Sequence, residues 1–219
     1  MAIAPTQFLA NAYRLNGFTM PTTVQWFGVD IDRTPKPVRS PDTPLRIGYI
    51  GQLAAHKGVD LLVEAFQSLQ PCNAELLIYG SVNQDVTYSR HLKKLAQEKV
   101  SFLGTFEPTD MGRIMNELDI LIIPSRWYEN SPLVLLYALA THTPVIVSRV
   151  DGLTEFLDEG VNGYSFERGS IPELSKVLQR FIIDPSLASR LSRSTSYDRT
   201  TEDMATDLSK QLEVALRSK

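Results

Sequence analysis

The sequence predicts an α/β fold in which a parallel sheet is covered by helices on both faces. Two observations carry this prediction. The candidate strands between residues 45 and 148 are continuous apolar runs, such as LRIGYIG (45–51) and ELLIYG (75–80), rather than alternating apolar and polar residues. A helical pattern follows each of these strands, and this alternation is typical of a parallel, Rossmann-like sheet.

The regular elements form one alternating series. The predicted strands are, in order, 45–51, 75–80, 100–104, 119–124, 144–148 and 163–166. The predicted helices are, in order, 59–69, 88–99, 109–118, 132–140, 174–183, 184–193 and 201–219. The first helix has one apolar face, which consists of Val59, Leu62, Val63, Phe66 and Leu69.

Three of these helices have a recognisable start. Thr109 is the candidate N-cap of the third helix. Pro132 stands at the start of the fourth helix, where its missing N–H has no intrahelical partner to lose. SIPE (170–173) resembles a capping box in front of the fifth helix.

The beginning of the chain does not form a unit of its own. FLANAYRLNG (8–17) predicts a short helix that ends at its glycine, and TTVQWF (22–27) predicts a strand. One helix and one strand cannot enclose a core, so residues 1–27 are expected to pack on the rest of the chain or on something outside this sequence. GVDIDRTPKPVRSPDTP (28–44) has four prolines and no apolar period, which is typical of a linker.

Composition limits the class of protein. The 219 residues are 43% hydrophobic and 21% charged, which is ordinary for a globular chain with a core. The formal net charge of -3 gives no reason to expect nucleic acid as a partner. Cys72 is the single cysteine, no apolar run reaches the length of a membrane span, and the N-terminus lacks the pattern of a signal peptide. We therefore expect a cytoplasmic protein.

The loops that follow strands hold the candidate site, because ligands of parallel α/β sheets bind at the carboxyl ends of the strands. GQLAAHKG (51–58) has a glycine at each end and Lys57 just before a helix, but it fits neither a Walker A loop nor the GxGxxG spacing. A helix N-terminus beside Lys57 suits a phosphate. The alternative is a plain turn with a solvated lysine.

PSRWYENSPLV (124–134) is the second candidate loop. Asn130 or Ser131 can cap the helix after this loop. Glu129 either places negative charge at the start of this helix or accepts hydrogen bonds from ligand hydroxyls. In the second case the amides on either side of Pro132 would face a phosphate, whereas Pro132 has no N–H to offer.

A third loop and two aromatic residues are further candidates. In SRVDGLTEFL (148–157), Asp151 can cap a helix, while Gly152 and Glu155 lie at the strand-to-helix turn. Trp127 and Tyr128 either form a stacking platform for a ligand or pack within the protein.

Together the loops make a stronger case than each loop alone. The successive strand ends carry Lys57, Gly80-Ser81, Glu129-Asn130-Ser131 and Gly152-Glu155. In a parallel sheet these ends share one edge, which favours a phosphate-bearing, hydroxyl-rich ligand such as a nucleotide sugar. No His/Cys cluster has metal-ligand spacing, so we expect neither a metal nor another cofactor.

Four stretches carry a resemblance to a known family. They are IGYIGQLAAHKGVDLLVEAF (47–66), VSFLGTFEPTDMGRIMNELDILIIPS (100–125), YENSPLVLLYALATHTPVIVS (128–148) and DGLTEFLDEGVNGYSF (151–166). In this order and spacing the chain resembles the donor-binding half of a GT-B glycosyltransferase of the large retaining class, family 4, also called group 1.

The resemblance implies a division of the chain. It makes 1–27 a remnant of the N-terminal acceptor domain, 28–44 the linker, 45–195 the nucleotide-sugar donor-binding domain and 196–219 a C-terminal helix. The rest of the acceptor domain is then missing from this sequence.

The resemblance also implies roles for single residues. Lys57 would bind the donor diphosphate, and Gly51 would let the backbone approach the ligand closely. Glu129 would be the first glutamate of the family's E-x7-E motif, contact the sugar hydroxyls and be the candidate catalytic residue. The amides around Ser131 and Leu133 would hold phosphate. The complete candidate donor-binding set is Gly51, Gln52, Lys57, Gly80, Glu129, Asn130, Ser131, Leu133 and Tyr137.

The sequence departs from the family pattern at three positions. Gln52 stands where a phosphate-binding arginine is usual, and His142 stands where glycine is common. Tyr137 stands where the family has its second glutamate, which grips the ribose. A phenol is a weaker partner for two hydroxyls than a carboxylate, so Tyr137 is either a weakened ribose contact or part of the helix packing.

The function implied by the resemblance is retaining hexosyl transfer from a nucleotide diphosphate sugar to an acceptor hydroxyl. The expected partners are the nucleotide-sugar donor and the missing acceptor domain, with membrane association of the full enzyme possible. One alternative is a degenerate or stand-alone nucleotide-binding module without transferase activity, which Gln52 and Tyr137 favour. Another is a different GT-B-like enzyme, such as a sugar-nucleotide epimerase.

Overall fold

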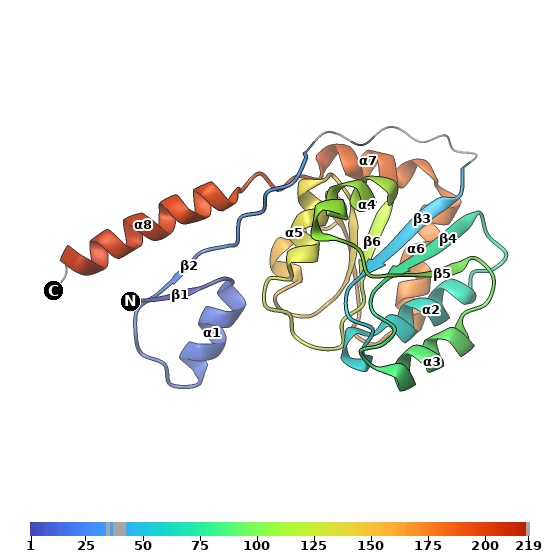
Figure 1. Ribbon diagram of the computed structural model, residues 1–219, viewed down its shortest axis with the longest axis horizontal. Coiled ribbons are helices and arrows are strands. Elements are labelled where there is room, and N and C mark those ends of the chain that lie inside the picture. The colour runs from blue at the N-terminus through green and yellow to red at the C-terminus, as the bar shows by residue number, and fades with distance from the viewer. Residues whose placement is uncertain (34–35, 37–42, 218–219) are drawn as a thin grey trace.

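The computed structural model describes residues 1–33, 36 and 43–217 (Figure 1). Its main body contains a six-stranded sheet in the order β5-β4-β3-β6-β7-β8, and every neighbouring pair is parallel. The strands are β3 (Leu45–Ile50), β4 (Ala74–Tyr79), β5 (Val100–Gly104), β6 (Ile120–Ile123), β7 (Val145–Ser148) and β8 (Gly163–Phe166). The predicted parallel sheet is confirmed.

The strand order reverses between β3 and β6. From β3 the chain moves outward through β4 to β5, and then returns to the other side of β3 as β6 before it continues through β7 to β8. In open parallel sheets such a switch point leaves a crevice at the carboxyl ends of the two strands, where ligands bind. The loops after β3 and β6 are therefore the natural place for a site.

Helices cover both faces of the sheet, as predicted. One core cluster joins the strands to α2 (Val59–Gln67), α3 (Val86–Leu95), α6 (Ile171–Ile183) and α7 (Ser186–Ser194). The other cluster joins them to α4 (Met111–Glu117) and α5 (Leu133–Ala140). The sequence LVLLYALA makes α5 apolar all round, which is typical of a buried helix.

The N-terminal residues form a small βαβ unit beside the last helix. It consists of β1 (Ala2–Ala4), α1 (Gln7–Leu15) and β2 (Thr22–Val24), with β1 and β2 parallel. Figure 1 shows this unit and α8 (Thr201–Arg217) together on one side of the main body. The prediction missed β1 and made β2 too long, because strands of three residues leave no periodic pattern.

Two predicted caps differ from the structure. The segment predicted to begin at Thr109 starts as the 3-10 turn η2 (Pro108–Asp110), and α4 has no side-chain cap. In the predicted capping box, Ser170 Oγ accepts from Glu173 N, but the Glu173 carboxylate accepts from Glu167 N instead of Ser170 N. The box is therefore only half formed.

The predicted linker lies partly outside the described residues, which omit 34–35 and 37–42. Its first residues are held by the start of α8 and the segment before it: Val29 N donates to Arg199 O over 3.0 Å, and Asp30 accepts from Thr201. Within the part of the chain that the structure describes, no helix has the combined length and hydropathy of a membrane span.

Candidate functional site

Lys57 and Glu129 meet at the switch point. Lys57 ends the 3-10 turn η1 (Ala55–Lys57) after β3, and Glu129 lies in the loop after β6. Lys57 Nζ donates to Glu129 Oε1 over 2.7 Å, and the two side chains are 27% and 10% exposed. The sequence analysis placed both residues at one sheet edge, but it did not predict their direct ion pair.

The loop after β7 packs against the backbone of Glu129. Glu129 N donates to Asp151 O over 3.1 Å. Gly152 has a φ of +85°, and a Cβ there would lie 1.4 Å from Glu129 O. Only glycine fits this approach. Asp151 does not cap a helix as predicted, because the 3-10 turn η3 (Thr154–Phe156) begins later and has no side-chain cap.

The residues after Glu129 do not cap α5 as predicted. Its N-cap is Pro132, which has no side-chain hydrogen bond to offer. Asn130 Oδ1 instead accepts from Thr6 Oγ1 of the N-terminal unit over 3.3 Å. Ser131 is buried with a φ of +53°, and among the described residues its hydroxyl has no hydrogen-bond partner. Leu133 is 48% exposed.

Gly51, Gln52 and Gly80 lie at the ends of two central strands. Gly51 N donates to Tyr79 O, and Gly80 N donates to Gly104 O. A Cβ at Gly80 would lie 2.2 Å from Gly51 O, so these strand ends touch. Gln52 is exposed, and its backbone carbonyl accepts from the Tyr49 hydroxyl over 2.7 Å.

Tyr137 lies within α5, eight residues after Glu129. It is half-buried and packs against the second core cluster. It also lines a cavity of about 660 Å³ whose other walls come from residues 30–32 and 108–117. Neither Lys57 nor Glu129 lines this cavity. Packing of Tyr137 on the core is thus observed, whereas its role as a ribose contact stays a prediction.

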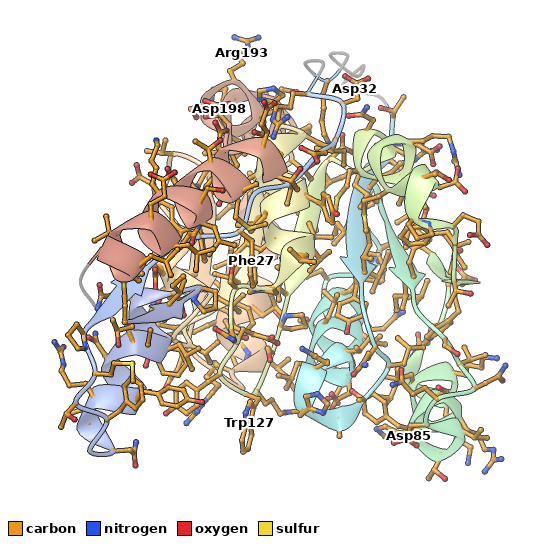
Figure 2. The ribbon with its side chains drawn as sticks, turned by 60° about the vertical axis from the view of Figure 1, so that its left-hand side comes forward. Phe27, Asp32, Asp85, Trp127, Arg193 and Asp198 are labelled. Atoms are coloured by element: carbon orange, nitrogen blue, oxygen red, sulfur yellow. The ribbon has the colours of Figure 1, made fainter. Side chains whose placement is uncertain are left out.

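The two aromatic residues before Glu129 differ in their surroundings. Tyr128 stacks on Phe8 with ring centroids 5.4 Å apart, and the Arg168 guanidinium lies over its ring. Trp127 is 66% exposed, and Figure 2 shows it pointing away from the body of the protein. Tyr128 therefore packs on the N-terminal unit although it is 49% exposed, and a stacking platform for a ligand stays an interpretation for both residues.

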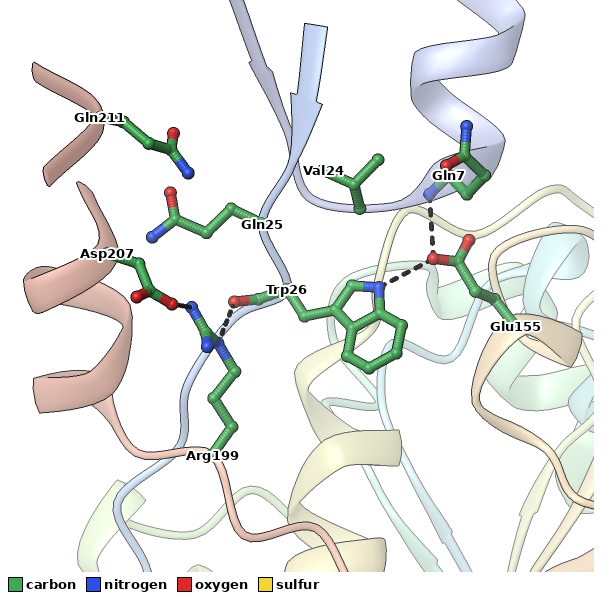
Figure 3. Close-up of a pocket in the computed structure, with 8 residues that line it drawn as sticks. All are labelled: Gln7, Val24, Gln25, Trp26, Glu155, Arg199, Asp207 and Gln211. Atoms are coloured by element: carbon green, nitrogen blue, oxygen red, sulfur yellow. Dashed lines mark hydrogen bonds and ion pairs between the residues drawn. The ribbon is translucent and has the colours of Figure 1, made fainter. Parts of the chain in front are cut away.

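Glu155 binds the N-terminal unit and not the candidate site. Its carboxylate accepts from Gln7 N and from Trp26 Nε1, both over 2.9 Å (Figure 3). It also accepts from Phe8 N over 3.2 Å. A carboxylate at the N-terminus of α1 is favoured by the helix dipole. This contact explains how residues 1–27 pack on the rest of the chain.

His142 has a structural position. Its φ of +57° is a conformation that glycine adopts most easily. Its ring nitrogens lie 2.6 Å from Thr195 O and 3.0 Å from Arg33 O. The side chain thus joins the end of α5 to two distant segments.

The sequence analysis missed Arg126. Its guanidinium donates to both carboxylate oxygens of Asp60 over 2.7 and 2.8 Å. Burial alone would raise the pKa of Asp60, but hydrogen bonds from Arg126 and Tyr88 outweigh it and hold the pKa below its ordinary value. The signal in the sequence was a basic residue, Arg126, just after one strand, and an acidic residue, Asp60, in the first turn of the helix that follows another strand.

The sequence profile of the family described as glycosyl transferases group 1 matches residues 30–196. The chain belongs to this family. The matched range contains the switch point, Lys57 and Glu129, so the candidate site lies inside the region that matches the family.

The curated relatives of this chain are longer than the chain. The glycogen synthase of Mycobacterium tuberculosis is 29% identical over 180 residues, which are 80% of this chain and 43% of the relative. An uncharacterised glycosyltransferase of Methanocaldococcus jannaschii is 34% identical over 128 residues, which are 56% of this chain and 32% of the relative. The chain therefore spans less than half the length of these relatives.

Solved GT-B glycosyltransferases share the fold. Alr3699/HepE of Anabaena, in complex with UDP-glucose, has a TM-score of 0.83 at 21% identity over 97% of this chain and 63% of that one. The sucrose-phosphate synthase of Thermosynechococcus elongatus has a TM-score of 0.81 at 22% identity over 99% of this chain and 58% of that one. At this identity the likeness shows the fold.

Proposed function

We propose that this chain binds the donor for a retaining glycosyltransferase that moves a hexosyl group from a nucleoside diphosphate to an acceptor hydroxyl. The observation that carries the proposal is the Lys57–Glu129 ion pair at the switch point of the sheet. A cation suits the diphosphate, and a carboxylate suits sugar hydroxyls. The UDP-glucose complex of Alr3699/HepE supports this class of donor.

The charge on the leaving group is the main chemical demand. As the bond between the anomeric carbon and the diphosphate oxygen breaks, negative charge grows on the diphosphate. The acceptor oxygen forms the new bond to the anomeric carbon, and its proton passes to the departing diphosphate oxygen, so the products are the glycoside and the nucleoside diphosphate. Lys57 and the N-termini of α2 and α5 would stabilise the departing diphosphate in place of a metal.

The ion pair is exchanged when the donor binds. Without a ligand, Lys57 compensates a carboxylate that is only 10% exposed. With the donor present, Lys57 would turn to a phosphate oxygen and Glu129 would accept from the sugar hydroxyls. When a nucleoside diphosphate without a sugar binds, Glu129 therefore competes with the diphosphate for Lys57.

This competition predicts opposite effects of Glu129→Gln on two ligands. UDP should bind about threefold to tenfold more tightly, because a competing negative charge is gone. UDP-glucose should lose the extra affinity that its sugar provides. Calorimetric titration of both ligands measures the difference, with Glu98→Gln, an exposed residue just before β5, as a control of equal charge change. Weaker UDP binding by Glu129→Gln would contradict the exchange.

The alternative function is a degenerate nucleotide-binding module, and the identities of Gln52 and Tyr137 favour it. If Tyr137 faces the ribose, Tyr137→Glu should tighten nucleotide binding about tenfold to a hundredfold, because a carboxylate accepts from both ribose hydroxyls. Glutamine has nearly the same shape as glutamate but no charge, so Tyr137→Gln should gain much less nucleotide affinity. Equal nucleotide affinities for the wild type, Tyr137→Glu and Tyr137→Gln would mean that the ribose binds away from Tyr137.

The remaining partners belong to the same proposal. An acceptor domain would cover the apolar side chains that α1 and α8 expose, such as Leu15 and Leu216, which are 85% and 72% exposed. We propose a cytoplasmic enzyme, whose acceptor side would decide any attachment to a membrane.

Calorimetric titration with UDP, ADP and GDP and their glucose conjugates tests the proposed function. We expect saturable binding of one nucleotide with a stoichiometry of one. A folded chain that binds none of them, and whose Tyr137→Glu variant binds one, would favour the degenerate module. A folded chain that binds none of them in either form would contradict donor binding.

A further inference from the structure

Arg126 ties together the loops that carry Lys57 and Glu129. Arg126 N donates to His56 O over 2.8 Å, and its guanidinium donates to Ala55 O over 2.9 Å. Both acceptors lie in the segment that ends at Lys57. Arg126 itself lies three residues before Glu129 in the other loop. One side chain therefore contacts the backbone of the neighbouring loop next to its functional lysine.

The two loops are also in direct backbone contact. Gly58 has a φ of +68°, and a Cβ there would lie 2.1 Å from Pro124 O. Only glycine allows this approach. Ser125 is fully buried, and its hydroxyl lies 3.4 Å from His56 O. The position of Lys57 is thus set from the β6 side of the switch point.

Asp60 orients the Arg126 side chain. It lies in the first turn of α2, where its two oxygens accept a bidentate pair of hydrogen bonds from Arg126. Tyr88 of α3 donates to Asp60 Oδ1 over 2.7 Å and accepts from Asp60 N over 3.1 Å. A carboxylate bound on both sides has a single orientation, and so does the guanidinium on it.

The same pair removes an electrostatic conflict. A free carboxylate in the first turn of α2 would repel a phosphate at that helix N-terminus. The Arg126 guanidinium neutralises Asp60, so the positive end of α2 and Lys57 stay available to an anion.

We propose that Arg126 and Asp60 form a positioning pair, which holds the η1 segment so that Lys57 meets the donor diphosphate. This inference rests on the proposed function, and it assigns Arg126 no contact with the ligand. The effect of Arg126 on ligand affinity must therefore depend on Lys57 and on the presence of phosphates in the ligand.

The test is a double-mutant cycle on nucleotide binding. UDP, ADP and GDP are titrated in turn into the wild type, Arg126→Met, Lys57→Ala and the double variant, with the matching nucleosides alongside. We expect Arg126→Met to weaken diphosphate binding about tenfold in the wild-type background and to change it less than twofold in the Lys57→Ala background. Nucleoside binding should be the same in the wild type and Arg126→Met.

Arg46→Met is the matched control, because Arg46 forms an ion pair of 2.7 Å with Glu75 and has a similar exposure. It should leave diphosphate affinity unchanged, and thermal melting shows whether each variant is folded. An equal loss for nucleosides and diphosphates, or a loss that persists without Lys57, would overturn the positioning role. Should Arg126→Met fail to fold, Tyr88→Phe, which frees one side of Asp60, takes its place with a smaller loss in the same pattern.

The proposed function and this inference fail in different ways. A wild-type chain that binds no diphosphate refutes both. Wild-type binding that Lys57→Ala weakens and Arg126→Met leaves unchanged refutes the positioning pair alone.

Discussion

Lys57→Ala is expected to weaken binding of the nucleoside diphosphate about tenfold to a hundredfold, because one charge-assisted hydrogen bond to a partly desolvated phosphate is lost. The substitution also leaves Glu129 without its partner at 2.7 Å, so a buried negative charge faces the incoming diphosphate. Calorimetric titration of the two proteins under identical salt measures the loss.

Lys94→Ala is the control for this prediction. Lys94 lies exposed in the last turn of α3, so its removal makes the same change in net charge away from the switch point. It should leave nucleotide affinity within about twofold. Equal affinities for Lys57→Ala and the wild type would show that the lysine of this loop is a solvated side chain of a plain turn.

Gly152→Ala is expected to lower the free energy of unfolding by about 3–5 kcal/mol, the upper range for a single substitution. Its Cβ would lie 1.4 Å from Glu129 O, and a backbone atom cannot move aside as a flexible side chain can. The φ of +85° adds strain for any residue with a Cβ. Because the obstacle is Glu129 itself, nucleotide-sugar binding should fall as well.

Gly169 provides a close control for this substitution. Its φ is +80°, but a Cβ there would have no heavy atom within 4 Å. Gly169→Ala should therefore show the backbone strain alone, about 1–2 kcal/mol. Urea denaturation of the two variants separates strain from the steric clash. If Gly152→Ala and Gly169→Ala lose the same free energy of unfolding, the loop after β7 does not pack against Glu129 O as described.

The main sheet could be predicted because its information is local. Apolar runs such as LRIGYIG mark strands buried on both faces, and the intervening helices force the strands to be parallel. That topology alone brings the loops of Lys57 and Glu129 to one edge. The ion pair between Lys57 and Glu129 could not be predicted without the strand order, because β3 and β6 are neighbours only when the sheet reverses between them.

The features that the sequence analysis missed depend on contacts between distant segments. Glu155 stands in a strand-to-helix turn, but its partners are the first amides of α1 and the Trp26 indole. Arg126 and Asp60 are 66 residues apart, and each alone is an ordinary charged residue of a loop or a helix start. Asn130 bonds Thr6 instead of capping α5. No local pattern records such pairings.

The structure of this chain crystallised with the nucleoside diphosphate that it binds tests the central claim most directly. The account predicts the diphosphate at the carboxyl ends of β3 and β6, with Lys57 Nζ within hydrogen-bonding distance of a phosphate oxygen and no longer paired with Glu129. A nucleotide bound elsewhere, with the Lys57–Glu129 ion pair intact, would contradict it.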